Sequence, residues 1–242
     1  MNPDEYTRMF ELEDRYWWFV ARRRIALKLL GRHLRPGSEV LLDVGCGTGV
    51  VLQELQSVGK PVGLDMSDVA LGYCRRRGLT RLVRADATAM PFGPSSCDAI
   101  VGLDVFEHIE RDDLAFEEAF RRLSPGGILV LSVPAFQSLW GPHDIALMHF
   151  RRYTKPMLKE RLERAGFQVE RLTYSVFILF PAVVVVRFFE KRKRGPAKAS
   201  LAALPNWLNA FLIGIQSVEG LLISSFNLPW GSSLIAVARK PL

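Results

Sequence analysis

The sequence predicts a doubly wound α/β fold with a seven-stranded, mostly parallel sheet, and three observations support this. Short apolar runs alternate with segments of helical length from about residue 38 onward, which is typical of βαβ crossovers. A glycine-rich turn directly follows the first apolar run, as in sheets that bind nucleotides at their carboxyl edge. The length of 242 residues fits one such domain with additions.

Seven strands and four connecting helices follow from this alternation. The predicted strands are 39–44, 61–65, 81–85, 98–103, 128–133, 168–173 and 233–238. The predicted helices are 50–57, 67–77, 112–123 and 155–165. Thr154 can cap the last of these helices, and Gly166 can end it in a left-handed turn.

Two regions lie outside the alternation. The first is an N-terminal helical cap, residues 1–37, with two predicted helices that meet at the aromatic cluster 16–19. The second is an apolar helical insertion, residues 174–231. The core then comprises residues 38–173, and residues 232–242 complete its sheet as the last strand.

Composition favours a reducing compartment. The three cysteines are widely spaced and form no CxxC pair, so neither a disulfide framework nor a zinc site is predicted. The N-terminal segment is acidic and aromatic and lacks the pattern of a secretory signal, so a cytoplasmic location is expected. The net charge of +7 comes from basic clusters that suit solvated helix faces, nucleic acid or anionic lipid alike.

The glycine-rich turn carries the chemistry. Its spacing is G-x-G-x-G, at Gly45, Gly47 and Gly49, and Asp43 comes just before it. The dinucleotide fingerprint has the wider spacing G-x-G-x-x-G and faces a pyrophosphate. A carboxylate at this place is a poor neighbour for phosphate and a good one for an ammonium group. The turn therefore predicts a cationic nucleoside and disfavours a nicotinamide-dependent oxidoreductase.

In the order of its motifs, the stretch 38–173 resembles the class I S-adenosylmethionine-dependent methyltransferases. Leu-Asp-Val-Gly-Cys-Gly-Thr-Gly at 42–49 matches the first motif of that family. The later matching segments are 63–67, 84–87 with 90–92, 97–108 and 123–127. The resemblance implies a Rossmann-like methyltransferase fold, with S-adenosylmethionine as cofactor and S-adenosylhomocysteine as product.

The resemblance also implies roles for single residues. It assigns the ribose hydroxyls to Asp65, the exocyclic amine of adenine to Asp86 and a ring nitrogen to the N–H of Ala87. The residues implied to bind the cofactor are Asp43, Gly45, Cys46, Gly47, Gly49, Asp65, Met66, Asp86, Ala87 and Leu103. The structural alternatives are that Asp43 and Asp86 are turn carboxylates and that Asp65 caps the next helix.

Methyl transfer from a sulfonium requires alignment, a desolvated pocket and, for a weak nucleophile, a base. Histidine is the natural base, and the chain has four. We rank His143 first because its neighbour Asp144 could orient it. His108 and His149 follow, and His33 is expected to be structural. The alternative is that the loop histidines cap helices and that proximity alone drives transfer.

Acceptor binding is predicted from basic and aromatic residues. Arg151 and Arg152, beside Tyr153, could clamp an anionic acceptor, although a solvated face explains them equally well. Trp18 and Trp140 are the expected aromatic contacts.

A metal site is not predicted. Asp104, Glu107 and His108 resemble the metal-binding pattern of some ubiquinone-pathway O-methyltransferases. However, Asp104 stands where that pattern has Glu, and no fourth ligand is evident.

The insertion is predicted to form two helices. The uncharged run 172–186 is shorter than the roughly 20 residues that a bilayer span needs, so a helix from Pro181 to about Arg194, with a basic end, is expected. Further on, six apolar residues recur at spacings of four and three, with polar residues on the other side. The apolar positions are Leu204, Leu208, Phe211, Ile215, Val218 and Leu222, and the polar positions are Asn206, Asn209, Gln216 and Glu219.

This amphipathic helix must dock on the core, on a second subunit of a homodimer or on a bilayer surface, because burial of its apolar side has to offset the ordering of the chain. The chain returns to the same sheet at 233–238. A single membrane crossing is therefore excluded, and interfacial contact is favoured over a hairpin of two spans.

These observations together predict a cytoplasmic methyltransferase for a hydrophobic small-molecule or lipid-like acceptor, with O-methylation expected first. Peripheral contact with the cytoplasmic membrane face is left open. The alternatives are C- or N-methylation of a small molecule and a noncatalytic S-adenosylmethionine-binding, membrane-associated module. A nucleic-acid substrate is not expected, because the sequence lacks the Asn/Asp-Pro-Pro-aromatic motif and the Pro-Cys nucleophile of nucleic-acid methyltransferases.

Overall fold

Seven strands form one sheet in the computed structural model, which describes residues 3–190 and 203–242. The strand order is β3–β2–β1–β4–β5–β7–β6, and β7 is antiparallel to both of its neighbours whereas the other pairs are parallel. The strands are β1 (Val40–Val44), β2 (Lys60–Asp65), β3 (Leu82–Arg84), β4 (Cys97–Leu103), β5 (Leu123–Pro134), β6 (Gln168–Ser175) and β7 (Ser233–Arg239). The order reverses between β1 and β4, which is where doubly wound sheets bind ligands.

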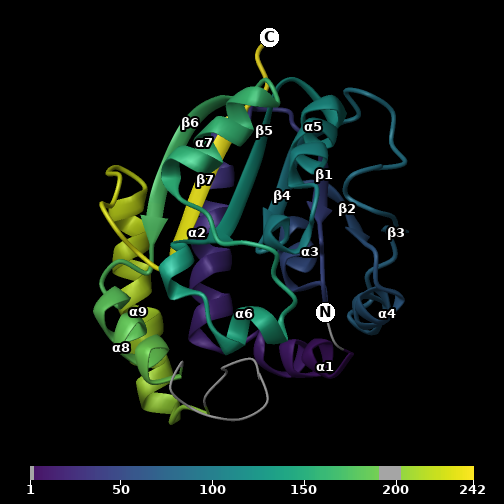
Figure 1. The fold of residues 1–242 in the computed structure, drawn as a ribbon. Helices are drawn as coiled ribbons and strands as arrows, with labels where there is room; N and C mark the ends of the chain where they lie inside the picture. Colours follow the sequence, from purple (N-terminus) through teal and green to yellow (C-terminus); the bar gives the residue numbers. More distant parts are fainter. Residues whose placement is uncertain (1–2, 191–202) are drawn as a thin grey trace.

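Helices cover both faces of the sheet (Figure 1). In that view α5 and α7 lie in front of the sheet and α2 lies behind it, while α1, α6 and α8 lie at the lower end of the molecule. The helices are α1 (Pro3–Leu12), α2 (Trp17–His33), α3 (Val50–Leu55), α4 (Asp68–Arg76), α5 (Asp112–Arg122), α6 (Pro142–Ala146), α7 (Lys155–Arg164), α8 (Phe180–Glu190) and α9 (Asn206–Ile223), with 3-10 turns η1 (Phe106–His108) and η2 (Gln137–Leu139).

The predicted fold class is confirmed. All seven predicted strands are present, and the largest shift is in β5, which begins at Leu123 rather than at residue 128. The central strands are buried along most of their length, which explains why continuous apolar runs marked them. At α7, the Oγ1 atom of Thr154 accepts the N–H of Met157 at 3.4 Å, and Gly166 follows the helix with φ +101°. Both predicted ends of this helix are therefore confirmed.

The insertion forms two helices where the structure describes it. Helix α8 begins at Phe180, one residue before Pro181, and its described part ends at Glu190. The remainder of the predicted helix, with the basic block 191–194, lies outside the described residues. No helix in the described parts of the chain is long and apolar enough to cross a bilayer.

Helix α9 turns its polar side toward the core, opposite to the usual arrangement of an amphipathic helix. Gln216 and Glu219 are buried, whereas Phe211 is 60% exposed and Val218 is 54% exposed. The carboxylate of Glu219 explains this, because it accepts the N–H of Val176 at 2.5 Å and that of residue 178 at 3.1 Å. Of the three docking candidates for the apolar side, the core is therefore wrong for Phe211 and Val218.

A second polar contact fixes α9 at its other end. The Oδ1 atom of Asn209 accepts the N–H of Trp17 at 2.9 Å, and its Nδ2 atom donates to the carbonyl of Arg15 at 2.8 Å. Gly220 faces Ile25 of α2, where an added Cβ would lie 3.2 Å from Cγ1. These contacts satisfy backbone groups at the start of α2 that burial would otherwise leave unpaired.

Candidate active site

A cavity of about 720 Å³ lies at the carboxyl ends of β1, β2, β4 and β5. Residues of α1, the start of α2 and α8 complete its wall, so that the N-terminal cap and the insertion both contribute to it. The sheet order places the ends of β1 and β2 on one side of this cavity and the ends of β4 and β5 on the other.

The glycine turn after β1 forms part of this wall. Gly45 and Gly47 line the cavity with φ +64° and +54°. A Cβ on Gly45 would lie 2.4 Å from Cγ2 of Val105, and one on Gly47 would lie 2.6 Å from Cε of Met9. Gly49 does not line the cavity; it begins α3 with φ +94° and packs on the neighbouring helix. Glycine at the first two positions thus keeps backbone accessible to a ligand.

Asp43 lies at the end of β1, 2% exposed, and lines the cavity. Its Oδ2 atom is buried and has no hydrogen-bond partner among the described residues. Burial, reinforced by the charges of Asp65 and Glu13, raises the pKa of this carboxyl well above its usual range. A buried carboxylate of this kind requires a donor or a cation. Asp43 therefore fits an ammonium group, as the sequence predicts.

Asp65 and Asp86 differ in burial and in their hydrogen-bond partners. Asp65 accepts the N–H of Gly47 at 3.0 Å and that of Ser67 at 2.9 Å, and burial raises its pKa. Asp86 is exposed and accepts both the N–H and the hydroxyl of Thr88 at 2.8 Å. Both line the cavity, and each carboxylate retains lone pairs for further donors. The predicted contacts that also line the cavity are Cys46, Met66, Ala87 and Leu103.

Asp144 and His149 form a hydrogen-bonded pair beside the cavity. Nδ1 of His149 lies 3.0 Å from Oδ1 of Asp144, and the histidine side chain is 5% exposed. Its Nε2 atom is buried and has no hydrogen-bond partner in the described parts of the chain. Because Asp144 is an acceptor when ionised, Nδ1 carries the hydrogen and Nε2 keeps its lone pair. His149 is therefore arranged as a proton acceptor.

Asp144 is held in its ionised form. Burial alone would raise its pKa, but the hydrogen bond from His149 and the charge of Arg152 outweigh burial and hold the pKa well below its usual range. Arg152 donates to both carboxylate oxygens, at 2.7 and 3.1 Å, and Gly141 donates its N–H at 2.9 Å. The orienting role predicted for Asp144 thus serves His149, whereas the sequence predicted it for His143.

His108 and His143 line the same cavity in a neutral form. Burial, together with the charge of His149, lowers the pKa of His108 to about 3. Burial, together with the charge of Arg187, lowers the pKa of His143 to about 3. Such rings remain neutral near pH 7 and bind a proton weakly. The lowered pKa of each ring argues against either as the base.

Glu107 lies next to these histidines, fully buried. Neither of its carboxylate oxygens has a hydrogen-bond partner within the described residues. Burial, followed by the charge of Asp104, raises its pKa well above its usual range. Glu107, His108 and His149 offer ligand atoms that all lie within 4.8 Å of one another, a spacing that suits one metal ion. Asp104, the first residue of the pattern considered in the sequence, instead forms an ion pair with Arg22.

Only some of the predicted acceptor contacts line the cavity. Trp18 and Arg152 line the cavity, but the guanidinium of Arg152 is occupied by Asp144 and by the carbonyl of residue 135. Arg151 and Tyr153 do not line it; both contact the Asp112 carboxylate, at 2.5 and 2.7 Å. Trp140 is also outside the set of lining residues. A clamp made of Arg151 and Arg152 is therefore wrong for this cavity.

Two cationic residues that the sequence analysis missed do line the cavity, Arg22 and Arg187. Arg22 lies one turn after the aromatic cluster 16–19 on α2, so helical spacing from that cluster could have found it. Glu13, which directly follows α1, was also missed. It is buried, contacts the hydroxyl of Thr48 and pairs with Arg77 at 2.8 Å, which anchors α1 over the glycine turn.

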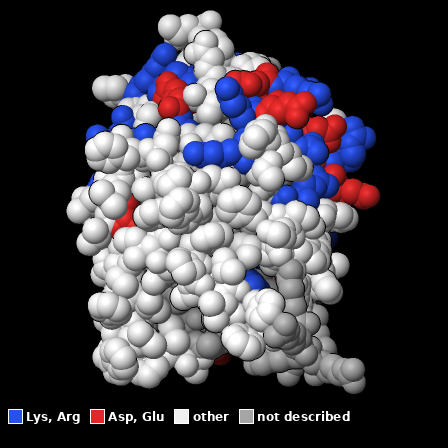
Figure 2. Space-filling model, turned by 60° about the vertical axis from the view of Figure 1, so that its left-hand side comes forward, with Lys and Arg blue, Asp and Glu red and all other residues white. Residues whose placement is uncertain are grey.

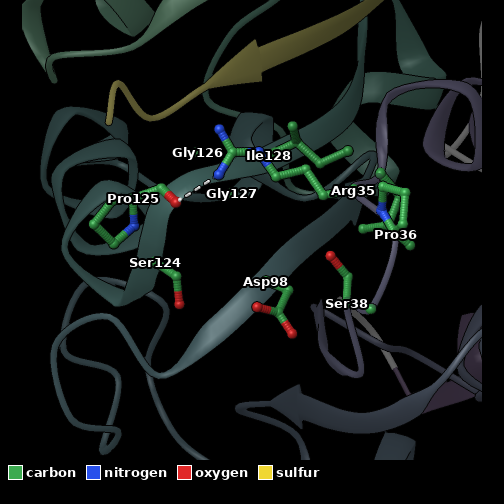
Figure 3. Close-up of a pocket in the computed structure, with 11 residues that line it drawn as sticks. Arg35, Pro36, Ser38, Asp98, Ser124, Pro125, Gly126, Gly127 and Ile128 are labelled. Atoms are coloured by element: carbon green, nitrogen blue, oxygen red, sulfur yellow. Dashed lines mark hydrogen bonds between the residues drawn. The ribbon is translucent and has the colours of Figure 1, made fainter.

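A second, smaller pocket of about 170 Å³ lies at the opposite end of the sheet (Figure 3). The Asp98 carboxylate in it accepts the N–H groups of Glu39 and Val40 at 2.9 and 3.0 Å. Arg35 donates to the carbonyl of Pro125 at 3.3 Å. Because these polar groups bond within the chain at the amino ends of the strands, the pocket is structural.

Sequence similarity agrees with this site. Residues 42–131 match the family model of a methyltransferase domain. A probable S-adenosylmethionine-dependent methyltransferase of Mycolicibacterium smegmatis is 31% identical over 172 residues, which cover 68% of this chain and 64% of that protein. An uncharacterized methyltransferase of Mycobacterium tuberculosis is 31% identical over 121 residues, 48% of this chain and 47% of that protein. The chain thus spans less than two thirds of the length of these curated relatives.

Solved structures share the fold. A chain from the complex between the Trm112 methyltransferase activator of Haloferax volcanii and a methyltransferase aligns with a TM-score of 0.64 at 19% identity, over 99% of this chain and 95% of that one. Phosphoethanolamine N-methyltransferase 2 of Haemonchus contortus, solved with S-adenosyl-L-methionine, aligns with a TM-score of 0.57 at 20% identity, over 90% and 52%. Fold and site define an S-adenosylmethionine-binding α/β domain. The chain belongs to the class I S-adenosylmethionine-dependent methyltransferases.

Proposed function

We propose that this chain transfers the methyl group of S-adenosylmethionine to a hydroxyl group of a hydrophobic small molecule, with His149 as the general base. The observation that carries the proposal is the buried Nε2 atom of His149, which has no hydrogen-bond partner among the described residues and belongs to a ring that lines the cavity. When bound, the cofactor supplies an activated methyl group on a sulfonium, and S-adenosylhomocysteine remains after transfer.

Side chains on the two sides of the cavity have different roles. Asp43 and Asp65, at the ends of β1 and β2, give one side of the cavity two carboxyl groups, whose charged forms a cationic nucleoside would favour. His149 follows β5 on the other side. Its Nε2 atom takes the proton of the acceptor hydroxyl, and the carboxylate of Asp144 stabilises the imidazolium that forms. Burial strengthens that charge pair.

The preference for a hydrophobic acceptor rests on the cavity wall. The start of α2 contributes Trp17, Trp18 and Phe19, and the segment around α8 contributes Leu179 and Val183. Pockets of this composition bind ligands through apolar contact and use a few polar groups to orient them.

Matched acceptors test this proposal. Alkylphenols and the corresponding alkylanilines differ only in the group that is methylated, and S-adenosylhomocysteine release reports turnover of either. We expect turnover of the phenols, with KM falling as the alkyl chain lengthens. Turnover of the anilines alone, or a KM that does not change with chain length, would contradict the hydroxyl or the hydrophobic part of the proposal.

A second candidate mechanism is favoured by one observation: neither carboxylate oxygen of Glu107 has a hydrogen-bond partner among the residues that the structure describes. In this mechanism Glu107, His108 and His149 would hold a divalent cation, which would lower the pKa of the acceptor hydroxyl in place of a base. Treatment with a chelator, followed by addition of Mg²⁺ or Mn²⁺, separates the two. Turnover that is lost and then restored supports the cation, and unchanged turnover supports His149 as base.

We also propose that the protein works in the cytoplasm. The three cysteines are buried free thiols, which is consistent with a reducing compartment.

A further inference from the structure

The outer sides of α8 and α9 expose a group of large apolar side chains, which we call the apolar face. On α8 the side chains of Val185, Phe188 and Phe189 are 50 to 58% exposed. On α9 and just after it the exposed members are Trp207, Phe211, Val218, Leu221, Leu222, Phe226 and Trp230. Figure 2 shows the side of the molecule that carries these helices, with charged residues gathered toward the upper end and few below. A group of exposed large apolar side chains of this kind marks an interaction site.

The orientation that exposes the apolar face is fixed from inside. The polar groups of Asn209, Gln216 and Glu219 are on the inner side of α9, bonded to backbone or to each other. On α8, Val183 and Arg187 line the cavity. Turning either helix to hide its apolar side would break these contacts and leave buried polar groups unpaired.

The charge of the segment between α8 and α9 favours a bilayer over a second copy of the chain as the partner of the apolar face. The segment 191–202 joins α8 to α9 and contains Lys191, Arg192, Lys193, Arg194 and Lys198 but no acidic residue. An anionic leaflet offers acyl chains to apolar helices and negative headgroups to basic residues that adjoin those helices in the sequence. A second copy of this chain would bring an identical basic segment, and the net charge of +7 opposes such pairing.

We propose that the apolar face docks on the surface of an anionic bilayer, with α8 and α9 lying in the interface. In this arrangement α8 lies between the bilayer and the cavity. Its inner residues line the cavity, and its outer residues belong to the apolar face. A hydrophobic acceptor reaches the site from the leaflet. This last step rests on the proposed function, whereas the docking does not.

Flotation with vesicles tests the docking. The probe is phosphatidylcholine vesicles with or without phosphatidylglycerol. The unchanged chain is expected to float with the anionic vesicles and to stay at the bottom with neutral ones. The variant Phe211→Asp/Val218→Asp is expected to lose about tenfold or more in partitioning, since each buried side chain of this size contributes more than that factor. Val69→Asp, at an exposed position of α4, is the control and is expected to float normally.

A second variant guards against misfolding of the first. Replacing Lys191, Arg192, Lys193 and Arg194 by Gln leaves the apolar face unchanged and is expected to weaken flotation on anionic vesicles. If the unchanged chain stays at the bottom with both kinds of vesicle, or if both variants float normally, the proposal is overturned. A dimer in light scattering that Phe211→Asp/Val218→Asp dissociates, without flotation, overturns it in favour of a second copy.

The two proposals fail separately. Flotation requires neither cofactor nor acceptor, whereas turnover is measured with a soluble alkylphenol in the absence of vesicles. A chain that floats but methylates no hydroxyl keeps the docking proposal and removes the proposed function. A chain that turns over but never floats does the reverse.

Discussion

The imidazole of His149 contacts Asp144 through Nδ1 at 3.0 Å, and its Nε2 atom is buried without a hydrogen-bond partner in the described parts of the chain. Asp144 is itself fully buried and held by Arg152 at 2.7 Å. This arrangement fixes the tautomer of the ring and leaves one lone pair for a proton.

Asp144→Asn is expected to lower kcat by about 10²-fold or more, because the ring loses the charge that stabilises its imidazolium. KM for the acceptor should change less than kcat. Because Asp144 also pairs with Arg152, thermal unfolding is measured in parallel. Arg152→Lys breaks the same ion-pair network without removing the carboxylate. A kcat loss in Arg152→Lys equal to that in Asp144→Asn would mean that the ion-pair network affects turnover only through the stability of the fold.

Asp43→Asn is expected to weaken S-adenosylhomocysteine binding by about 10- to 100-fold, since a hydrogen bond to a charged group contributes about 1.5 to 3 kcal/mol. Calorimetry measures this. The unfolding free energy should stay the same or rise, because a buried carboxylate without a partner costs stability. Asp98→Asn is the matched control. It should lower stability through its contacts with residues 39 and 40 and leave the dissociation constant unchanged.

The lowered pKa values of His108 and His143 predict a loss of stability in acid. Each ring is neutral in the folded state down to about pH 3 and is protonated below about pH 6.5 when unfolded. The unfolded state therefore binds more protons between these pH values, so stability falls as pH decreases from 6.5, by about 1 kcal/mol per pH unit for each ring.

The raised pKa values of Asp43 and Glu107 act in the opposite direction, so the test is a difference between variants. His108→Gln/His143→Gln should flatten the dependence of unfolding free energy on pH between 6.5 and 5. The prediction fails if urea titrations of this variant and of the unchanged chain give parallel pH profiles.

Glu219→Ala is expected to destabilise the chain by about 2 to 3 kcal/mol, because two backbone N–H groups, those of Val176 and Ile178, lose their acceptor. Val218 is adjacent to Glu219 in sequence but lies on the exposed side of the helix. Val218→Ala should therefore change the unfolding free energy by less than about 0.5 kcal/mol. Urea denaturation compares them. A larger loss in Val218→Ala would show that α9 packs through its apolar side after all.

The sheet was predictable because most of its strands are buried on both faces and separated by glycine turns and helices. The apolar stripe on α9 could also be predicted from the sequence. Whether that stripe faces the core or the solvent could not. Periodicity places Phe211 and Val218 together and Glu219 opposite, without information on what lies beside either side. The segment around Val176, whose N–H groups need an acceptor, is 43 residues distant from Glu219 in sequence, so only the folded chain brings the two together.

The pairing of Asp144 with His149 was missed for a local reason. Asp144 follows His143 directly, and adjacent residues on a helix point about 100° apart. In α6, therefore, the two side chains diverge. The chain bends after α6, and the N–H of His149 bonds to the carbonyl of Asp144 at 2.9 Å, which brings the later histidine back to the carboxylate. The acidic motif residues were found because each ends or follows a strand of the sheet.

The most direct test of the account is the rate of S-adenosylhomocysteine formation by His149→Gln at saturating cofactor and alkylphenol. The account predicts a kcat about 10²- to 10⁴-fold lower than that of the unchanged chain, with the same calorimetric affinity for S-adenosylhomocysteine and with His143→Gln close to normal. A kcat for His149→Gln within about threefold of the unchanged chain, in the absence of metal ions, would contradict it.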